Sequence, residues 1–449
     1  MAAEWPTIDA LLGGTRGMRR AGRALLPKWP NEADEAYANR LATATLFPAF
    51  RRTLGVMAGK PFAKELTFGD DVPPKIREWC EDVDMQGANL HSFCADLMEE
   101  VIGYGIAGVL VDYPKTTGVR TLADERAQGA RPYWVHVRHD QILGWRTKCI
   151  GGPLYMSQLR LLEWVEEPDG PYGTKVVEQV RVLEPGKWET HRANEKGVFV
   201  LYEGGVTTLD IVPFVPFFGR RTGFMQGESP LIDLAHLNVK HWQSQSDQDT
   251  ILHVARVPIL AAVGVEESFE LTVGGSAAVK ISNPDGDLKF VEHSGAAISA
   301  GADSLKALEE QMIQTGAELL VAQPGQRTAT EASNDAEANK SELQAIVERF
   351  EDSIDMALYL MARWVGLDDG GHVNLFKDFT TLSAESARTI VEMYQSGMIS
   401  KATALREQQR RGVLAADIVV EDELEAVDAE GPGLGLVGRE DGDDTDGAV

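Results

Sequence analysis

Long hydrophobic runs are absent from this sequence of 449 residues. No apolar stretch approaches the roughly 20 residues that a transmembrane helix needs. The first residues, MAAEWPTIDALLGG, also lack the charged start and unbroken apolar core of a signal peptide. With 43% hydrophobic and 25% charged residues, the composition is typical of a soluble protein. We therefore expect a chain that is made in the cytoplasm and has no membrane partner.

Cysteine is scarce, and no metal-binding pattern is present. Cys80, Cys94 and Cys149 lack the spacing of metal ligands, and their odd number argues against a disulfide framework. We expect them to be reduced and structural. If His136 and His139 both lie on one strand, their spacing of three places the two imidazoles on opposite faces, so a shared metal ion is not expected.

Basic residues are outnumbered, because 43 Lys and Arg stand against 69 Asp and Glu, for a net charge of −26. Proteins that grip nucleic acid by its phosphates carry basic stripes. The balance argues against that class, but not against a protein that DNA passes without sticking. The acidity is concentrated at the end, where residues 421–449 hold eleven Asp or Glu and the single Arg439. We expect this tail to be disordered.

The opposite bias occurs near the start of the chain. Five basic residues lie within a segment of thirteen: Arg16, Arg19, Arg20, Arg23 and Lys28. They predict a solvated basic face, with contact to an acidic partner as the alternative.

Signatures of catalysis are also missing. Neither G-x-S-x-G nor H-E-x-x-H occurs. Gly103, Gly105 and Gly108 satisfy G-x-G-x-x-G, but they follow a predicted helix and precede a strand, the reverse of the dinucleotide-binding order. Close backbone packing is the better interpretation of these glycines. GVMAGKP is too short for a P-loop and has Pro61 where Ser or Thr would hold magnesium. We expect no catalytic residue, cofactor or metal.

The first half of the chain mixes helical and strand periodicity. Residues 33–58 and 86–107 have helical spacing, and GVLVDYP reads as a short buried strand. From 131 to 201 the apolar residues alternate, which predicts an antiparallel sheet. VPFVPFFG closes this region, and its prolines permit only an edge strand or an extended crossing.

The second half predicts long helices around a small strand module. Ser229 as N-cap and Pro230 at the first helical position predict a helix over 229–256. Its middle, HWQSQSDQD, is polar nearly all round, which suggests packing between copies rather than a monomer core. Strands and turns follow, then a helix over 303–319 and, after a polar loop, a helix from 334 to 365, with acidic Asp335 and Glu337 in its first turn.

The last of these helices carries an apolar stripe on the three-four rhythm. Its members are Leu343, Ile346, Val347, Phe350, Ile354, Ala357, Met361 and Trp364.

This order of elements resembles the portal protein of double-stranded-DNA bacteriophages. More narrowly, the chain is similar to a portal-like phage family long described only as a domain of unknown function, on stretches such as YANRL, MAGKPF and GESPLIDLAHLN. The resemblance covers roughly residues 30–425 and implies an α+β fold with wing, stem and clip regions and a reduced crown. In that family twelve copies form a ring at one capsid vertex.

Carried over by position, the resemblance implies eight regions. They are an N-terminal wing region (1–228), a first stem helix (229–263), a clip (264–297), a second stem helix (298–321), a tunnel loop (322–333), a long wing helix (334–366), a wing strand with crown-proximal helices (367–420), and the acidic tail (421–449).

The tunnel loop falls in the stretch LLVAQPGQRTATEASNDAE, which has no bulky residue after Val321. Small polar side chains suit the narrowest passage for DNA, and Arg327 could touch phosphates. The candidate loop residues are Gln323, Gly325, Gln326, Arg327, Thr328 and Thr330. The candidates for an acidic channel wall are Asp247, Asp249, Glu309, Glu310 and Glu318.

The partners implied by the resemblance are further copies of the chain, the major capsid protein and scaffold, a terminase motor, a head–tail adaptor, and double-stranded DNA that passes without sequence preference. The location implied is the virion. Two alternatives stay open at this point: a cytosolic enzyme whose active site lies in the sheet region near His136, and a helical scaffold that binds protein alone.

Overall fold

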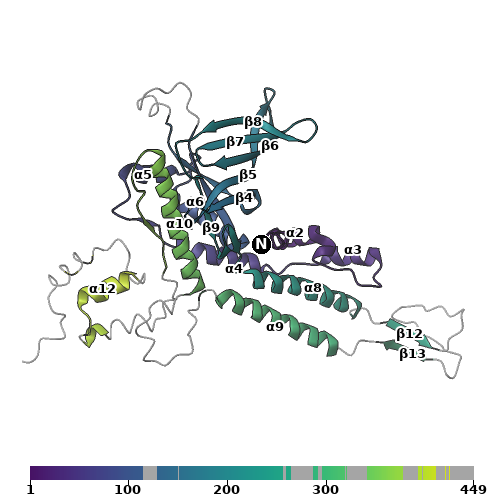
Figure 1. Ribbon diagram of the computed structural model, residues 1–449. Helices are drawn as coiled ribbons and strands as arrows, with labels where there is room; N and C mark the ends of the chain where they lie inside the picture. Colours follow the sequence, from purple (N-terminus) through teal and green to yellow (C-terminus); the bar gives the residue numbers. More distant parts are fainter. Residues whose placement is uncertain are drawn as a thin grey trace, which may run out of the picture. The chain divides into compact units, whose positions relative to one another are not determined.

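The computed structural model describes residues 1–114, 129–149, 151–255, 259–263, 287–291, 296–318, 320, 341–377, 393–396, 398–410, 420 and 424. The chain divides into two compact units, Met1–Lys377 and Asp378–Val449. The first unit combines helices with antiparallel sheets, which is the expected α+β class (Figure 1).

The helices ahead of the sheets are α1 (Trp5–Leu12), α2 (Gly14–Ala21), α3 (Asp34–Thr43), α4 (Ala49–Gly59), α5 (Pro74–Trp79) and α6 (Leu90–Tyr104), with the 3-10 turns η1 (Gly22–Ala24), η2 (Lys60–Phe62) and η3 (Cys80–Asp82). The predicted helical stretch 33–58 is divided into α3 and α4, and Pro48 stands directly before α4. The side chain of Asn89 caps α6 by accepting a hydrogen bond from the Ser92 amide at 2.8 Å. Gly105 ends this helix at a φ of 86° in the left-handed region, a position that suits glycine.

A three-stranded sheet in the order β3-β2-β9 forms the centre of the first unit. Its strands are β2 (Ile106–Asp112), β3 (Tyr133–Val137) and β9 (Phe214–Phe218). β2 is buried along its length, as a short apolar run predicts. β9, from VPFVPFFG, lies at the edge, which confirms the interpretation of its prolines.

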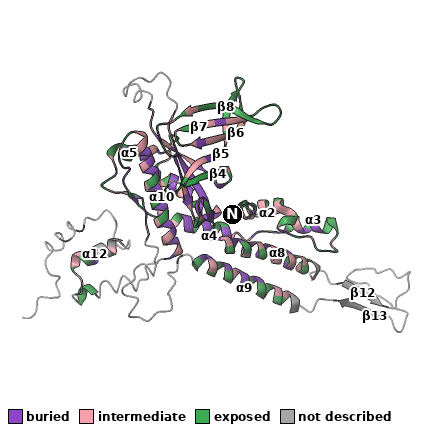
Figure 2. Cartoon of the chain, viewed as in Figure 1, coloured by how far each residue is buried: buried purple, intermediate pink, exposed green. Residues whose placement is uncertain are grey.

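The predicted alternating region forms a five-stranded antiparallel sheet in the order β4-β5-β6-β7-β8. The strands are β4 (Ile142–Cys149), β5 (Leu154–Asp169), β6 (Gly173–Glu184), β7 (Lys187–Ala193) and β8 (Phe199–Val206). Two short strands, β10 (Arg220–Gly223) and β11 (Gln226–Glu228), follow β9 as a hairpin. Much of β6 and β8 is solvent exposed (Figure 2).

The long helix α10 (Glu342–Trp364) covers β9 and supplies a large part of the core. Seven of the eight stripe residues are buried, and Trp364, half-buried, donates from Nε1 to the carbonyl of Val111 at 3.0 Å. The predicted start at residue 334 is wrong. Ser341 has an extended backbone and forms a capping box with Gln344, so the helix begins one residue later.

The other long helices also differ from their predicted bounds. α8 (Ile232–Ala255) begins three residues after the predicted N-cap, because Ser229 and Pro230 lie in a turn. There the Ser229 hydroxyl donates to the carbonyl of Ile102 at 2.8 Å and accepts from the Leu231 amide, just ahead of the helix, at 3.1 Å. α9 (Ala296–Glu318) begins earlier than predicted and includes the last residues assigned to the clip.

Between these helices, β12 (Ile259–Val263) pairs with β13 (Asp287–Val291) in antiparallel register. The strand pair therefore begins before the predicted clip boundary at residue 264. Most of the predicted clip, the tunnel loop, and the acidic tail apart from Leu424 lie outside the described residues.

Near the end of the first unit, β14 (Val373–Asn374) pairs with β1 (Thr67–Phe68). In the second unit, α12 (Lys401–Arg410) begins after Ser400, whose hydroxyl accepts a hydrogen bond from the Thr403 amide at 3.2 Å.

Candidate functional site

The predicted channel residues lie on the helical hairpin formed by α8 and α9. These helices run side by side, and Leu305, Leu308 and Met312 of α9 are buried at their contact (Figure 1). Gln248 of α8 ties the two together, because its Nε2 donates to the carbonyl of Ile298 at 2.9 Å. The hairpin is therefore a packed unit within one chain.

The polar middle of α8 is partly buried within the single chain, and its predicted packing between copies stays a prediction. His241, Ser246 and Gln248 are each less than 9% exposed, and Trp242 is fully buried. Only some of its polar atoms have partners within the chain. Gln243 Nε2 donates to the carbonyl of Leu25 at 3.0 Å, whereas His241 Nδ1, Trp242 Nε1 and Ser246 Oγ are buried with no hydrogen-bond partner among the described residues.

Two of the five predicted acidic residues lie close to a basic side chain of the same chain. Asp247 Oδ1 lies 3.8 Å from a guanidinium nitrogen of Arg40, which is itself bound closely by Glu32. Burial raises the pKa of Asp247 against the opposing attraction of Arg40. Glu309 Oε1 lies 3.3 Å from Nε2 of His241. Asp247 therefore links α8 to α3, whereas Glu309 links the two helices of the hairpin to each other.

The other three acidic residues, Asp249, Glu310 and Glu318, are exposed in the single chain. Asp249 accepts a hydrogen bond from Gln245 at 2.8 Å. Of the five candidates, these three fit a solvated wall best.

The tunnel-loop candidates Gln323, Gly325, Gln326, Arg327, Thr328 and Thr330 lie outside the described residues. The chain enters their segment from the end of α9 and leaves it at the start of α10. The segment therefore connects two long helices, as the sequence predicts.

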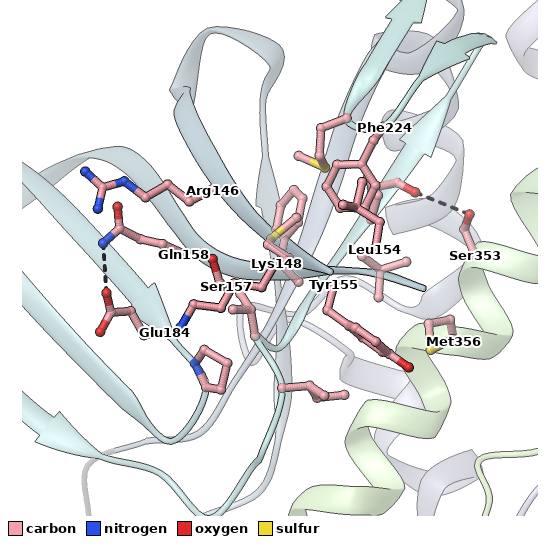
Figure 3. A pocket seen from close by; sticks show the side chains of 18 of the residues that line it. Arg146, Lys148, Leu154, Tyr155, Ser157, Gln158, Glu184, Phe224, Ser353 and Met356 are labelled. Atoms are coloured by element: carbon pink, nitrogen blue, oxygen red, sulfur yellow. Dashed lines mark hydrogen bonds between the residues drawn. The ribbon is translucent and has the colours of Figure 1, made fainter. Parts of the chain in front are cut away.

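A groove that the sequence did not predict opens beside β4 (Figure 3). It has a volume of about 1130 Å³ and is lined by β4, β5, β9, β10 and α10. Leu154, Tyr155 and Met356 expose apolar surface there. Its cations are Arg146, Lys148, Arg221 and Arg349, and within the described ranges none forms an ion pair with a carboxylate.

Two features of the sequence pointed weakly to this groove. Arg146 and Lys148 alternate on β4, and exposed apolar residues open β5. The groove itself depends on α10, roughly 200 residues later in the chain, which supplies Arg349, Ser353 and Met356. No local pattern predicts that contact.

The surroundings of His136 and His139 do not resemble an active site. His139 lies in the 3-10 turn η4 (His139–Gln141), not on β3 with His136, so the expected strand spacing does not apply. Its imidazole is only 3% exposed, stacks on Tyr104 at 3.6 Å, and meets Trp5 edge-on. A ring covered in this way offers no face to a substrate.

The same cluster holds a buried ion contact. His139 Nδ1 lies against Glu100, and the His139 amide donates to Glu100 at 3.2 Å. Burial raises the pKa of Glu100, but the hydrogen bonds from His139 outweigh burial, and the net pKa is lowered. The contact joins α6 to η4 and is structural.

The glycines of the G-x-G-x-x-G pattern lie where the backbone packs closely. A side chain at Gly108 would overlap the Phe214 ring, and one at Gly105 would overlap the backbone of Glu228, so close packing is confirmed. Cys80 and Cys94 are buried as expected, but Cys149 is exposed at the end of β4. No cluster of potential metal ligands occurs among the residues that the structure describes.

The basic N-terminal segment is partly used within the chain. Arg19 donates to the carbonyl of Ala44 at 2.9 Å, and Arg23 and Lys28 both contact Asp34. Arg16 and Arg20 remain exposed. None of the described helices is both long and apolar enough to cross a bilayer.

Comparison with known families and structures gives limited matches. Residues 230–365 match a domain of unknown function, DUF4055, and this segment runs from just before α8 to just after α10. No curated protein matches the chain.

Three solved structures are similar at low identity. A chain from the neck of an empty GTA particle is 12% identical, with a TM-score of 0.43 over 81% of this chain and 90% of that chain. A chain from the virion of a native gene transfer agent particle is 12% identical, with a TM-score of 0.43 over 87% of this chain and 97% of that chain. A chain from the neck of the native particle, computed with C12 symmetry, is 13% identical with the same TM-score and coverage. Values this low do not establish a common function.

Proposed function

We propose that this chain is the portal protein of a double-stranded-DNA phage or phage-like particle. In this role, copies form a ring at one capsid vertex, twelve being expected from the family resemblance. DNA enters and leaves through the ring, which also serves as the docking site for the packaging motor and the tail adaptor. The chain itself performs no catalysis in this proposal.

The order of elements from α8 to α10 is the observation that carries the proposal. Along the chain, α8 is followed by the β12–β13 pair and then by α9, which packs back against α8. A polar segment comes next and precedes the long core helix α10. This order agrees with the order of stem, clip, stem, tunnel loop and wing helix that the family resemblance implies. The segment matched by the domain of unknown function spans the same elements.

Exposed charge on the hairpin also supports the proposal. Asp249, Glu310 and Glu318 leave carboxylates at the surface of α8 and α9. A basic lining would hold phosphates strongly enough to slow the passage of DNA, whereas an acidic wall does not bind them. The assignment of these side chains to a channel wall is part of the proposal.

The state of assembly tests the proposed function. We expect the purified protein to form particles of several hundred kilodaltons that appear in negative-stain images as rings with a central hole. Light scattering at micromolar concentration should show little free 49.0 kDa chain. A stable species of that single-chain mass across dilution and salt would contradict the proposal, and compact particles without a hole would favour an enzyme or a scaffold.

A further inference from the structure

The edge strand β8 exposes an unusual amount of apolar surface. Its partner on one side is β7, and no described strand pairs with its other side. Phe199, Val200, Leu201, Tyr202 and Val206 are between 41% and 86% exposed (Figure 2). Long apolar edges present unpaired backbone groups and readily add another strand, so proteins normally cover or charge them. In β8 the charge is limited to Glu203, and the cover to Arg192 over the Tyr202 ring at 3.7 Å, among the described residues.

The strand at the opposite edge of the same sheet, β4, also has one side without a described partner strand. β4 pairs with β5 alone among the described strands. Because the five strands are antiparallel in sequence order, the first and the fifth run in the same direction. Neighbouring copies in a ring are related by a rotation about the ring axis. When this axis is parallel to the strands, the rotation leaves the strand direction unchanged. β8 of one copy would then lie parallel to β4 of the next.

Residue pairing places two of the apolar side chains of β8, Phe199 and Leu201, on the face where the groove opens. Arg146 of β4 pairs with Gln158 of β5, and both line the groove. Leu162, four residues along β5, is on the same face, because side chains alternate with a period of two.

From there the pairing continues across the sheet. Leu162 pairs with Val180, Val180 with His191, and His191 with Leu201. Leu201 of β8, and Phe199 two residues away, therefore share a face with Arg146. A sheet continued from one copy to the next would bring these two side chains over the neighbour's groove.

We propose that β8 of one copy pairs with β4 of the next copy and inserts Phe199 and Leu201 into the groove beside Tyr155 and Met356. This interface rests on the proposed function, because it names the surfaces that would join copies in the ring. The strand and the groove are different surfaces of one chain, so the contact is heterologous and repeats until the ring closes.

A second copy fits these surfaces better than a different protein. Both open edges belong to the same sheet, and their strands run in the same direction. The β8 edge carries exposed apolar side chains, and the β4 edge lies beside a groove with exposed apolar surface, so the two edges can complement each other. A two-fold β8–β8 dimer would cover β8 but leave the groove empty. The cations Arg146 and Lys148 at β4 also reduce repulsion between copies that each carry a net charge of −26.

Cross-linking tests the proposed neighbours with a native residue. Cys149 is exposed at the end of β4, whereas Cys80 and Cys94 are buried. Burial also raises the pKa of Cys80 to about 12, so it is a poor nucleophile. We would introduce Val206→Cys at the end of β8 and treat the assembled protein with a short bismaleimide. The proposal predicts a ladder of covalent multimers.

Matched controls identify the contact. Val206→Cys with Cys149→Ser should give no ladder, and neither should Val56→Cys, which places an exposed thiol on α4. Rings without a ladder in the first variant would overturn this interface while leaving the portal proposal intact. Covalent dimers from Val206→Cys with Cys149→Ser would indicate a β8–β8 contact and would also overturn it. Failure of the unmodified chain to form rings would instead contradict the proposed function.

A second variant tests the apolar insertion. Replacing both Phe199 and Leu201 with Lys should leave the fold of the single chain unchanged, because both side chains are exposed. Assembly should weaken at least about tenfold, as expected for the loss of central apolar contacts. Val176→Lys is the control, since Val176 is equally exposed on the same sheet but lies on β6. Unchanged assembly of the double variant would contradict the proposal.

Discussion

Asn238 on α8 holds the start of α4 through Phe50. Its Oδ1 accepts a hydrogen bond from the Phe50 amide at 3.0 Å, and its Nδ2 donates to the carbonyl of Phe47 at 2.8 Å. Asn238 is fully buried, so water does not reach its side chain to replace either hydrogen bond. One amide side chain thus satisfies two backbone groups at a helix N-terminus that has no side-chain cap of its own.

Replacing Asn238 with Leu should therefore destabilise the chain strongly. The Phe50 N–H would lose its partner, and an unsatisfied buried group costs roughly 1–3 kcal/mol. The Phe47 carbonyl would lose one of its two donors, since it also accepts from the Ala49 amide at 2.9 Å, and a lost hydrogen bond costs about 1 kcal/mol. We expect a loss of about 2–4 kcal/mol in the free energy of unfolding, measured by chemical denaturation. Lys240→Ala, an exposed change on the same helix, is the control and should alter stability by less than about 0.5 kcal/mol. An equal effect of the two changes would contradict this account.

The same contact shows why sequence could predict some elements but not their surroundings. Asn238 and Phe50 are 188 residues apart in the chain. Helical periodicity is a local signal, so the apolar stripe of α10 could be identified from Leu343 to Met361. Which polar residues become buried depends on distant segments, so the sequence did not predict that part of the polar middle of α8 is buried within the single chain.

The predicted starts of α8 and α10 were wrong for a related reason. Pro230 after Ser229 has the form of an N-terminal signal, but the Ser229 hydroxyl is bound by Ile102 on α6. At α10, the local pair Ser341 and Gln344 was a better signal than acidic residues further upstream. The groove beside β4 was not predicted at all, because it is assembled from strands and a helix far apart in the chain.

Gly108 permits β2 and β9 to pack closely, and this can be tested. A methyl group at this position would overlap the ring of Phe214, which is only 6% exposed and has little room to move. Overpacking of this kind typically costs about 1–3 kcal/mol. Gly108→Ala should lower the melting temperature accordingly. Gly55→Ala on α4 is the control, since nothing lies near its added carbon, and it should stabilise by up to about 1 kcal/mol.

His136 should make stability depend on pH. Burial lowers its pKa below the ordinary value of 6.5, against a weaker attraction from Glu100. Below about pH 6.5 the unfolded chain binds a proton that the folded chain does not, so this contribution is full above that pH and is lost as pH falls toward the folded pKa. The loss from this one group is at most about 1.4 kcal/mol per pH unit.

Substitution isolates this group from other titrating residues. His136 Nε2 is buried and has no hydrogen-bond partner among the described residues, so His136→Phe should leave stability near pH 7.5 almost unchanged. The variant should lose less stability than the parent between pH 6.5 and 5.5, as followed by denaturant titration. His253→Gln, at an exposed position on α8, should keep the parent profile. Parallel profiles for the parent and His136→Phe would show that another group is responsible.

The acidic surface of the hairpin should keep DNA from binding tightly. We expect weak association of the protein with duplex DNA, without sequence preference, in fluorescence anisotropy. Changing Asp249, Glu310 and Glu318 together to Lys should raise the affinity and steepen its dependence on salt, because each phosphate contact adds about one unit to the logarithmic slope. Nanomolar binding by the unmodified protein at physiological salt would contradict an acidic channel wall.

The polar segment between α9 and α10 provides the most direct test of transport. If residues 322–333 project into the channel, their size affects the passage of DNA but contributes little to folding, because a solvated loop buries little apolar area. Deleting Gln326–Thr330, or replacing Thr328 and Thr330 with Trp, should leave ring formation and thermal stability nearly unchanged and should reduce DNA packaging. Arg327→Ala should act more mildly, since one screened contact per copy is worth about 1 kcal/mol or less. Particle yield and DNA content measure the effect, with ring formation scored in parallel. Packaging at the unmodified level by the deletion variant would show that the segment only connects two helices, even where rings still form.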